Sequence, residues 1–121
     1  MIDATIEKKG DDYLMFLKDE TLLPEVERNI RMTTSDDLYE GWAPVSEALT
    51  GHYTEGPTAT RINGEWIVYF DRYREGSMGA IVSEDLENWT DISDSIQFPK
   101  GTRHGTVLKV KQSVVDRLKE E

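Results

Sequence analysis

The 121-residue chain contains no cysteine, which excludes disulfide bonds, thiolate metal ligands and a cysteine nucleophile. It has no apolar run approaching the roughly 20 residues of a membrane span, and Met1 is followed by Ile-Asp rather than by a signal segment. Basic residues are also scarce: 14 Lys and Arg against 24 Asp and Glu give a net charge of -10. Nucleic acid and anionic membranes are therefore disfavoured as partners.

The sequence contains a repeat of about 50 residues. Residues 29–42 and 77–89 share the pattern Ser-x-Asp-Leu followed by Trp, with Ser35 and Ser83 separated by 48 positions. Upstream of each, residues 10–20 and 64–75 show a Gly turn, an acidic residue, an aromatic residue and then an apolar run. Repeats of this length indicate stacked supersecondary units.

Each unit is predicted to be an antiparallel set of strands. The pair Asn63-Gly64 between two extended runs is a strong hairpin signal. The runs at 13–17 and 66–70 are continuous rather than alternating, which predicts strands covered on both faces. Four-stranded units with this period are typical of β-propeller blades, and a plain β-sandwich is the alternative.

The predicted organisation is one all-β domain over residues 1–121, a partial propeller. It comprises about two four-stranded antiparallel blades, one further strand and a short terminal helix: blade 3–50, blade 55–98, strand 104–110 and helix 111–121. Val114, Val115 and Leu118 have the spacing of one helix face. Propellers typically close with at least four blades, so this chain alone is not expected to close a ring.

Three polar residues stand at the predicted start of the innermost strand of each unit. They are Asp3, Glu55 and His104, separated by 52 and 49 positions. The first strand of every propeller blade lines the central channel, so equivalent positions converge at one end of the axis. We therefore expect two carboxylates and an imidazole to face a common polar funnel.

Four stretches together resemble the C-terminal half of the five-bladed propeller glycosidases of glycoside hydrolase family 43, the arabinanase and β-xylosidase group. They are "IDAT", "TEGPTATRINGEWIVYFDRY", "SEDLENWTDISD" and "FPKGTRHGTVLKV". The resemblance covers nearly the whole chain. Its most specific element is an acid-Gly-Pro corner followed one blade later by Arg-His-Gly-Thr.

The resemblance implies an inverting hydrolase of arabinose- or xylose-containing glycans. It makes Glu55 the general acid and Asp3 the aspartate that raises the acid's pKa, because a nearby carboxylate disfavours ionisation. It places Arg103 and His104 at the substrate, and His104 also beside a hydrated cation, often calcium, in the channel. No cofactor is otherwise required.

One part of the family's machinery has no counterpart. The resemblance places the general base on a first blade, whereas this sequence begins at the equivalent of the third. Asp19 and Asp71 end the second strands, but nothing assigns either one as the base. Loss of a general base typically costs about 10²- to 10⁴-fold in rate. The isolated chain is therefore expected to be inactive or weak, and the alternative is a non-catalytic, sugar-binding or self-assembling propeller fragment.

The same residues also have purely structural interpretations. Asp3 fits a solvated strand edge and His104 fits a strand cap or an internal hydrogen bond. Packing between blades is favoured over sugar stacking for Trp42, Trp66 and Trp89. Exposed blade faces and strand edges favour association, so we expect the chain to form a homo-oligomer, most simply a dimer. The competing explanation for the incomplete ring is that the chain is a fragment of a longer glycosidase.

Overall fold

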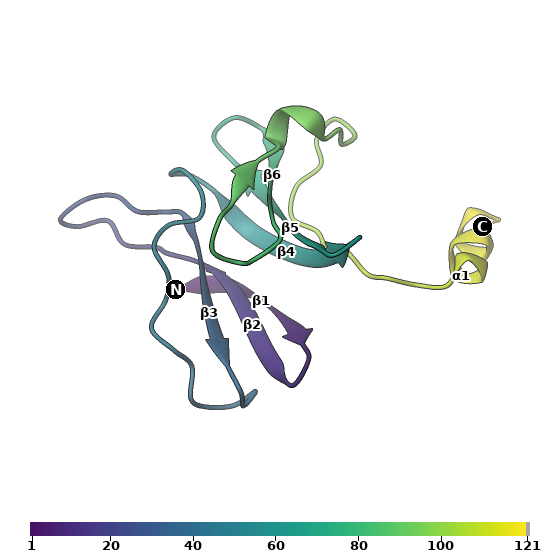
Figure 1. The fold of residues 1–121 in the computed structure, drawn as a ribbon. Helices are drawn as coiled ribbons and strands as arrows, with labels where there is room; N and C mark the ends of the chain where they lie inside the picture. Colours follow the sequence, from purple (N-terminus) through teal and green to yellow (C-terminus); the bar gives the residue numbers. More distant parts are fainter. Residues whose placement is uncertain (121) are drawn as a thin grey trace.

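The computed structural model describes residues 1–120, which form two antiparallel sheets and a C-terminal helix (Figure 1). The first sheet has the order β1-β2-β3 and the second β4-β5-β6-β7. The strands are β1 (Ile2–Lys9), β2 (Asp12–Lys18), β3 (Ile30–Ser35), β4 (Glu55–Ile62), β5 (Glu65–Arg72), β6 (Ser77–Ser83) and β7 (Thr90–Asp91). A short 3-10 helix (Ser93–Ser95) and α1 (Gln112–Lys119) follow. The predicted all-β blades with a terminal helix are confirmed.

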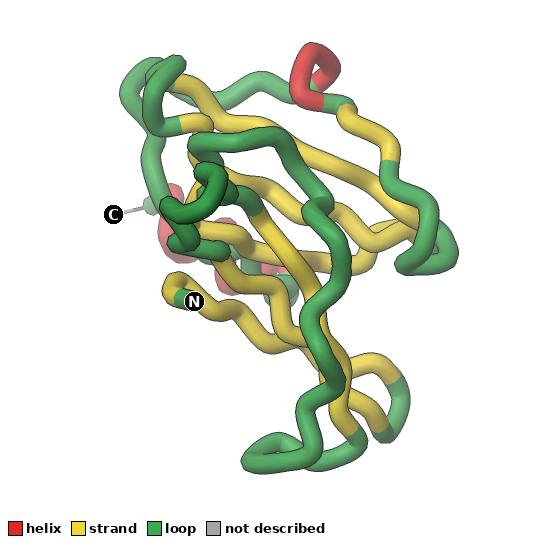
Figure 2. The backbone as a smooth tube through the Cα atoms, turned by 90° about the vertical axis from the view of Figure 1, so that its left-hand side faces the viewer, coloured by secondary structure: helices red, strands yellow, loops and turns green. Residues whose placement is uncertain are grey.

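The first blade has three strands rather than the four predicted. Residues 43–49 occupy the place of the fourth strand and are drawn as loop in Figure 2. The backbone N–H groups of Ala43, Ser46 and Leu49 donate to alternate carbonyls of β3, at 2.8 to 2.9 Å. Each step of three residues in the segment 43–49 therefore spans only two residues of β3, and this mismatch prevents a regular ladder.

The predicted strand at 104–110 is also corrected, because these residues have no strand structure. The N–H of Val107 donates to the hydroxyl of Thr58 at 3.1 Å, a side-chain contact rather than a ladder. Within residues 1–120 the two sheets consist of β1 to β7, and this stretch pairs with neither sheet. A β-prone segment without a partner strand cannot satisfy its backbone as a sheet.

The two inner hairpins have the same register. Ile2 lies opposite Lys18 and Glu55 lies opposite Asp71, and an irregularity follows each first pair before regular pairing resumes. The repeat offset in this region is thus 53 rather than the predicted 52 residues. Asp3 corresponds to Gly56, and both have a left-handed backbone, with φ of 53° and 56°.

The hydrophobic core lies between the two sheets. Its members come from both blades: Leu14, Phe16, Ile30, Ala59, Trp66, Val68, Phe70 and Ile81. Trp89 packs edge-on against Phe16 with ring centroids 5.9 Å apart. Packing between blades is therefore confirmed for Trp66 and Trp89, while Trp42 is half-buried.

The prediction that the two apolar runs are covered on both faces is wrong for β5, and two residues of the run in β2 are likewise only half-buried. Val68 and Phe70, which face the first sheet, are buried, whereas Ile67 and Tyr69 on the opposite face are half-buried. The far face is met by Phe98, whose ring packs edge-on against Tyr69 at 5.6 Å. A loop covers less surface than a third sheet would.

Helix α1 lies apart from both sheets (Figure 1), and none of its residues is buried. It is short, and within residues 1–120 no helix has the length and apolar character needed to cross a membrane.

Candidate active site at the start of the inner strands

Asp3, Glu55 and His104 come together as expected from the sequence. One ligand atom of each lies within 4.8 Å of the others. Asp3 comes from β1, Glu55 begins β4, and His104 lies on the loop after the second sheet. Residues separated by 101 positions therefore form one cluster, which the propeller-like arrangement predicts.

The Glu-Gly-Pro corner gives Glu55 its place. The pairing of β4 with β5 is irregular between Glu55 and Thr58, so Gly56 and Pro57 form a bulge. Gly56 has a φ of 56°, and a Cβ there would stand 2.7 Å from Nδ1 of His104. Only glycine allows both this backbone and the close approach of the imidazole. The N–H of Gly56 also points to Oδ2 of Asp3 at 3.4 Å.

Glu55 is surrounded by cationic and polarisable groups. Its Oε1 lies 3.0 Å from Nε2 of His104 and 3.6 Å from the guanidinium of Arg103. Its Oε2 accepts a hydrogen bond from Nζ of Lys18 at 2.8 Å. Lys18 is buried, also pairs with Glu20 at 2.6 Å, and lies 4.8 Å from the ring centre of Tyr73.

These contacts set the ionisation of Glu55. Burial raises its pKa, but the hydrogen bonds from Lys18 and His104 outweigh burial and hold the pKa below its ordinary value. The pKa of Glu55 is thus lowered here, whereas the expected role of Asp3 is to raise it. One carboxylate cannot override an ammonium within hydrogen-bond distance.

Neither Asp71 nor Asp19 is placed to act as a general base. Asp71 is completely buried opposite Glu55, and its Oδ2 accepts a hydrogen bond from Nε of Arg103. Asp19 pairs with Arg31 at 2.9 Å and accepts the N–H of Thr21. Both carboxylates are engaged in structural pairs, which agrees with leaving them unassigned.

One residue of the cluster, Lys18, was missed by sequence reasoning, whereas Asp71 was recognised but given no role. Lys18 and Asp71 both touch the surroundings of Glu55 and occupy equivalent positions, Lys18 as the last residue of β2 and Asp71 one residue before the end of β5. The signal was available, because a charged residue directly follows each apolar run of the repeat, "YLMFLK" and "WIVYFD". Buried charged residues at equivalent repeat positions mark the end of the blade that carries the cluster.

The cluster is also the place where a cation could bind. Asp3, Glu55 and His104 offer two carboxylates and one imidazole. Calcium takes six to eight mainly oxygen ligands, so these residues fit a cation that keeps several waters. The three ligand atoms are close enough together to surround one ion. The contact between His104 and Glu55 would have to open to admit it.

Comparison with protein-family models relates this chain to glycosyl hydrolases. A family model described as "Probable glycosyl hydrolase domain", of a group related to glycosyl hydrolase family 43, matches residues 1–116. A search of curated protein sequences found no match.

Two solved structures have a similar fold. Native arabinanase from Bacillus subtilis is 19% identical with a TM-score of 0.57, covering 74% of this chain and 35% of its own. An exo-1,5-alpha-L-arabinanase from a bovine ruminal metagenomic library is 17% identical with a TM-score of 0.54, covering 75% and 35%. This chain thus spans about a third of each arabinanase.

Proposed function

The chain belongs to the family of probable glycosyl hydrolase domains related to glycosyl hydrolase family 43, and we propose that it takes part in the hydrolysis of arabinose- or xylose-containing glycans. Within this proposal Glu55 is the general acid, Asp3 orients it, and Arg103 and His104 contact the sugar. The arabinanases that share the fold favour an arabinan-type glycan.

The observation that carries the proposal is the convergence of Asp3, Glu55 and His104 from three separate segments. Glu55 is fixed at the start of an inner strand by a bulge that requires glycine. Its carboxylate is only partly exposed, with a side-chain exposure of 19%, so it can meet a ligand while staying oriented. Such preorganisation is what a catalytic acid needs.

In an inverting reaction water attacks the anomeric carbon while the bond to the leaving oxygen breaks. Protonated Glu55 gives its proton to that oxygen, and a base on the opposite face takes a proton from the water. The base normally lies about 6.5 to 9.5 Å from the acid. Asp3 lies closer than this, which supports an orienting role rather than that of the base.

Glu55 must gain a proton before it can act. Lys18 and His104 favour its ionised form, so substrate binding would have to loosen at least one of these contacts. No residue of the chain is assigned as the base. Turnover by the chain alone is therefore expected to be low.

A second candidate function is sugar binding without hydrolysis. The lowered pKa of Glu55 favours it, because an ionised carboxylate accepts hydrogen bonds from sugar hydroxyls but donates no proton. Asp19 and Asp71 are both held in ion pairs, which also favours binding without hydrolysis.

The test measures hydrolysis of nitrophenyl arabinofuranoside and xyloside beside calorimetric binding of arabino-oligosaccharides. Glu55→Gln should lower turnover by at least about 10²-fold with binding retained, because amide and carboxyl are nearly isosteric. Glu65→Gln, at the other end of the same hairpin, is the matched control and should change neither. Undiminished turnover in Glu55→Gln contradicts the acid role, whereas binding without turnover in the wild type supports the second function.

We also propose that the cluster can bind a hydrated cation such as calcium, held by Asp3 and His104 beside Glu55. A carboxylate that binds a cation cannot donate a proton at the same time, so the ion and the acid role compete at Glu55. Calorimetry with calcium alone should show binding that His104→Ala and Asp3→Asn weaken. Equal binding by these variants and the wild type would contradict this site.

A further inference from the structure

Two buried aspartates each pair with an arginine, and the pairs differ in what the arginine does with its other N–H groups. In the first blade Oδ2 of Asp19 lies 2.9 Å from Nε of Arg31. The two terminal nitrogens of Arg31 also donate, one to the carbonyl of Ser46 and one to Glu27, each at 3.0 Å. All three nitrogens of this guanidinium are therefore engaged within the fold, and its side chain is only 15% exposed.

The pair in the second blade leaves its arginine open to solvent. Asp71 is completely buried, and its Oδ2 accepts a hydrogen bond from Nε of Arg103. The side chain of Arg103 is 60% exposed, and within residues 1–120 its two terminal nitrogens donate no hydrogen bond. One of them lies 3.6 Å from Oε1 of Glu55. Asp71 thus fixes Arg103 at one nitrogen and leaves the outer N–H groups available to a ligand beside Glu55.

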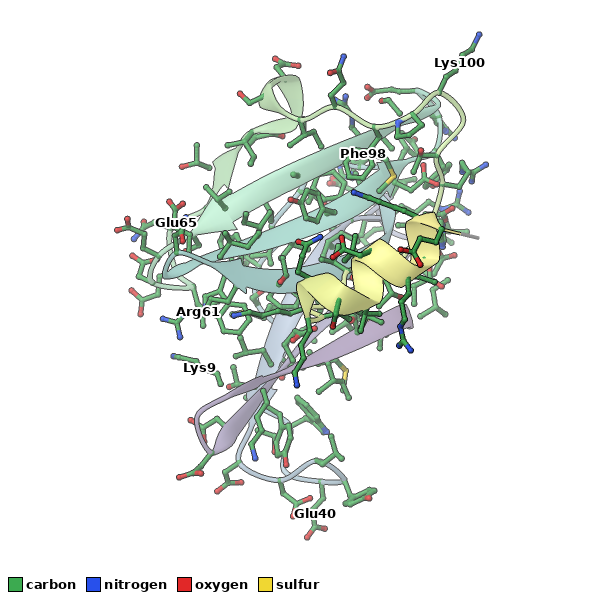
Figure 3. The ribbon with its side chains drawn as sticks, turned by 90° about the vertical axis from the view of Figure 1, so that its right-hand side faces the viewer. Lys9, Glu40, Arg61, Glu65, Phe98 and Lys100 are labelled. Atoms are coloured by element: carbon green, nitrogen blue, oxygen red, sulfur yellow. The ribbon has the colours of Figure 1, made fainter. Side chains whose placement is uncertain are left out.

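The fixed member of this pair is the carboxylate. Asp71 lies in the interior of the second sheet, because β5 pairs with Glu55 of β4 on one side and with Met78 of β6 on the other. Arg103 lies on the loop after the 3-10 helix, so regular secondary structure does not hold it. Figure 3 shows this loop at Phe98, which lies against the second sheet, and at Lys100, which points away from it. The sheet therefore sets the position of the carboxylate, and the carboxylate sets that of the guanidinium.

A guanidinium held in this way is suited to a sugar. Its planar fork presents N–H donors in fixed directions, and Asp71 accepts only the one at Nε. Hydroxyl oxygens, which sugars carry in number, accept such hydrogen bonds. An open hollow of about 340 Å³ is lined by Gly56 and His104, the residues that follow Glu55 and Arg103 in the chain. Space for a ligand therefore adjoins both side chains.

We propose that Asp71 is a positioning residue, which holds Arg103 so that its outer N–H groups contact a sugar bound at Glu55. This inference rests on the proposed function, because it concerns the same sugar, and it adds a residue that does not itself touch the ligand. An apolar side chain would fill the same place without the cost of burying a charge. Packing alone therefore does not account for Asp71.

The test is a double-mutant cycle between positions 71 and 103, measured by calorimetric binding of arabino-oligosaccharides. Asp71→Asn keeps the size of the side chain and removes its charge, and it should weaken binding about 10-fold, roughly the value of one hydrogen bond to a charged group. Arg103→Met should weaken binding at least as much. Added to Arg103→Met, Asp71→Asn should cause no further loss, because Asp71 acts only through Arg103.

Asp19→Asn is the matched control, because it breaks the other buried pair and should leave the affinity for sugar unchanged. The NMR signal of the Arg103 Nε–H group, recorded without sugar, should shift and exchange faster with water in Asp71→Asn but not in Asp19→Asn. A loss of stability alone would not separate the two variants in this way.

Arg103→Lys tests the same role without altering the sheet, and it decides alone if thermal unfolding shows that Asp71→Asn is not folded. Lysine keeps the charge, but its single nitrogen cannot bind Asp71 as Nε does and also present a fork to the sugar. Arg103→Lys should therefore lose as much affinity as Arg103→Met.

Unchanged affinity in Asp71→Asn, or a further loss from it in the Arg103→Met background, would overturn the proposal. Binding by Arg103→Lys that equals the wild type, or an unaltered Arg103 signal in Asp71→Asn, would also overturn it. These results would leave the proposed function intact. A wild type that binds no arabino-oligosaccharide would instead overturn the proposed function and the sugar contact together.

Discussion

The two blades share a scaffold but differ in what covers them and in what they carry. Phe16 and Tyr69 are equivalent, each lying opposite a threonine of the inner strand. Phe16 is completely buried because the second sheet packs on it, whereas Tyr69 is half-buried because a loop covers it. Burial of a repeated position thus depends on the next layer rather than on the repeat itself.

The two blades also differ in the charged residues that occupy equivalent positions. Ile2 and Lys18 of the first hairpin correspond to Glu55 and Asp71 of the second. One blade therefore supplies a carboxylate at the start of its inner strand, and the other supplies the ammonium that binds it. The difference between equivalent positions, rather than their similarity, makes the cluster.

The largest expected effect comes from the aromatic pair. Phe16→Ala should lower the free energy of unfolding by about 3 to 5 kcal/mol, the usual cost of emptying a buried phenylalanine site. Tyr69→Ala should cost clearly less, because its ring already contacts solvent. Chemical denaturation of both variants checks this, and equal losses would show that the two faces are covered alike.

A smaller effect is expected at the two left-handed positions. Gly56→Ala should lower the free energy of unfolding by about 1 to 2 kcal/mol, the cost of a left-handed L-residue, and should displace His104. Asp3→Gly, at the equivalent position, should relieve backbone strain and change stability little. Thermal unfolding with NMR of the His104 ring measures both. An unmoved imidazole in Gly56→Ala would contradict the described packing.

The pairing of Lys18 with Glu55 predicts a pH dependence. Because the pKa of Glu55 is lowered, its contribution to stability is complete above about pH 4.5 and is lost as the pH falls through the folded-state pKa. Lys18→Met should raise the pKa of Glu55 and remove this contribution. The stability difference from wild type should therefore be largest near neutral pH and shrink on acidification.

Denaturation at several pH values, beside NMR titration of the Glu55 carboxyl, measures this change. Lys9→Met, on the same hairpin and exposed, is the control and should leave the pKa of Glu55 unaltered. A pKa of Glu55 that stays the same in Lys18→Met would show that His104 alone lowers it.

The smallest effect is expected in the Ser-x-Asp-Leu turns. The Asp85 carboxylate accepts the N–H groups of Glu87 and Asn88 and the Asn88 side-chain amide, which lower its pKa, whereas Asp37 accepts two backbone N–H groups. Asp85→Ala should thus lower the unfolding temperature by a few degrees, and Asp37→Ala by less. The loss at Asp85 should persist to low pH. A larger loss in Asp37→Ala would reverse this ranking of the turns.

Much of the fold and of the cluster was predictable from the sequence, because hairpins and repeats depend on local chemistry. Asn63-Gly64 fixes a hairpin by its backbone preferences, and both are left-handed as such a turn requires. The repeat predicted two blades, and the three polar residues at the blade starts predicted the cluster. The offset of 52 was wrong by one residue, because it matched Asp3 with Glu55 as two carboxylates, whereas the strand register makes Ile2 the equivalent of Glu55.

By itself the sequence determined the hairpins, the repeat and the identity of the clustered side chains, since turn chemistry and apolar runs act over a few residues. Tertiary structure alone decided the ionisation of Glu55, because the buried Lys18 that lowers its pKa lies 37 positions away in the chain. It also decided which runs form strands: a strand exists only where a neighbour pairs with its backbone, and residues 104–110 have none within their own described chain.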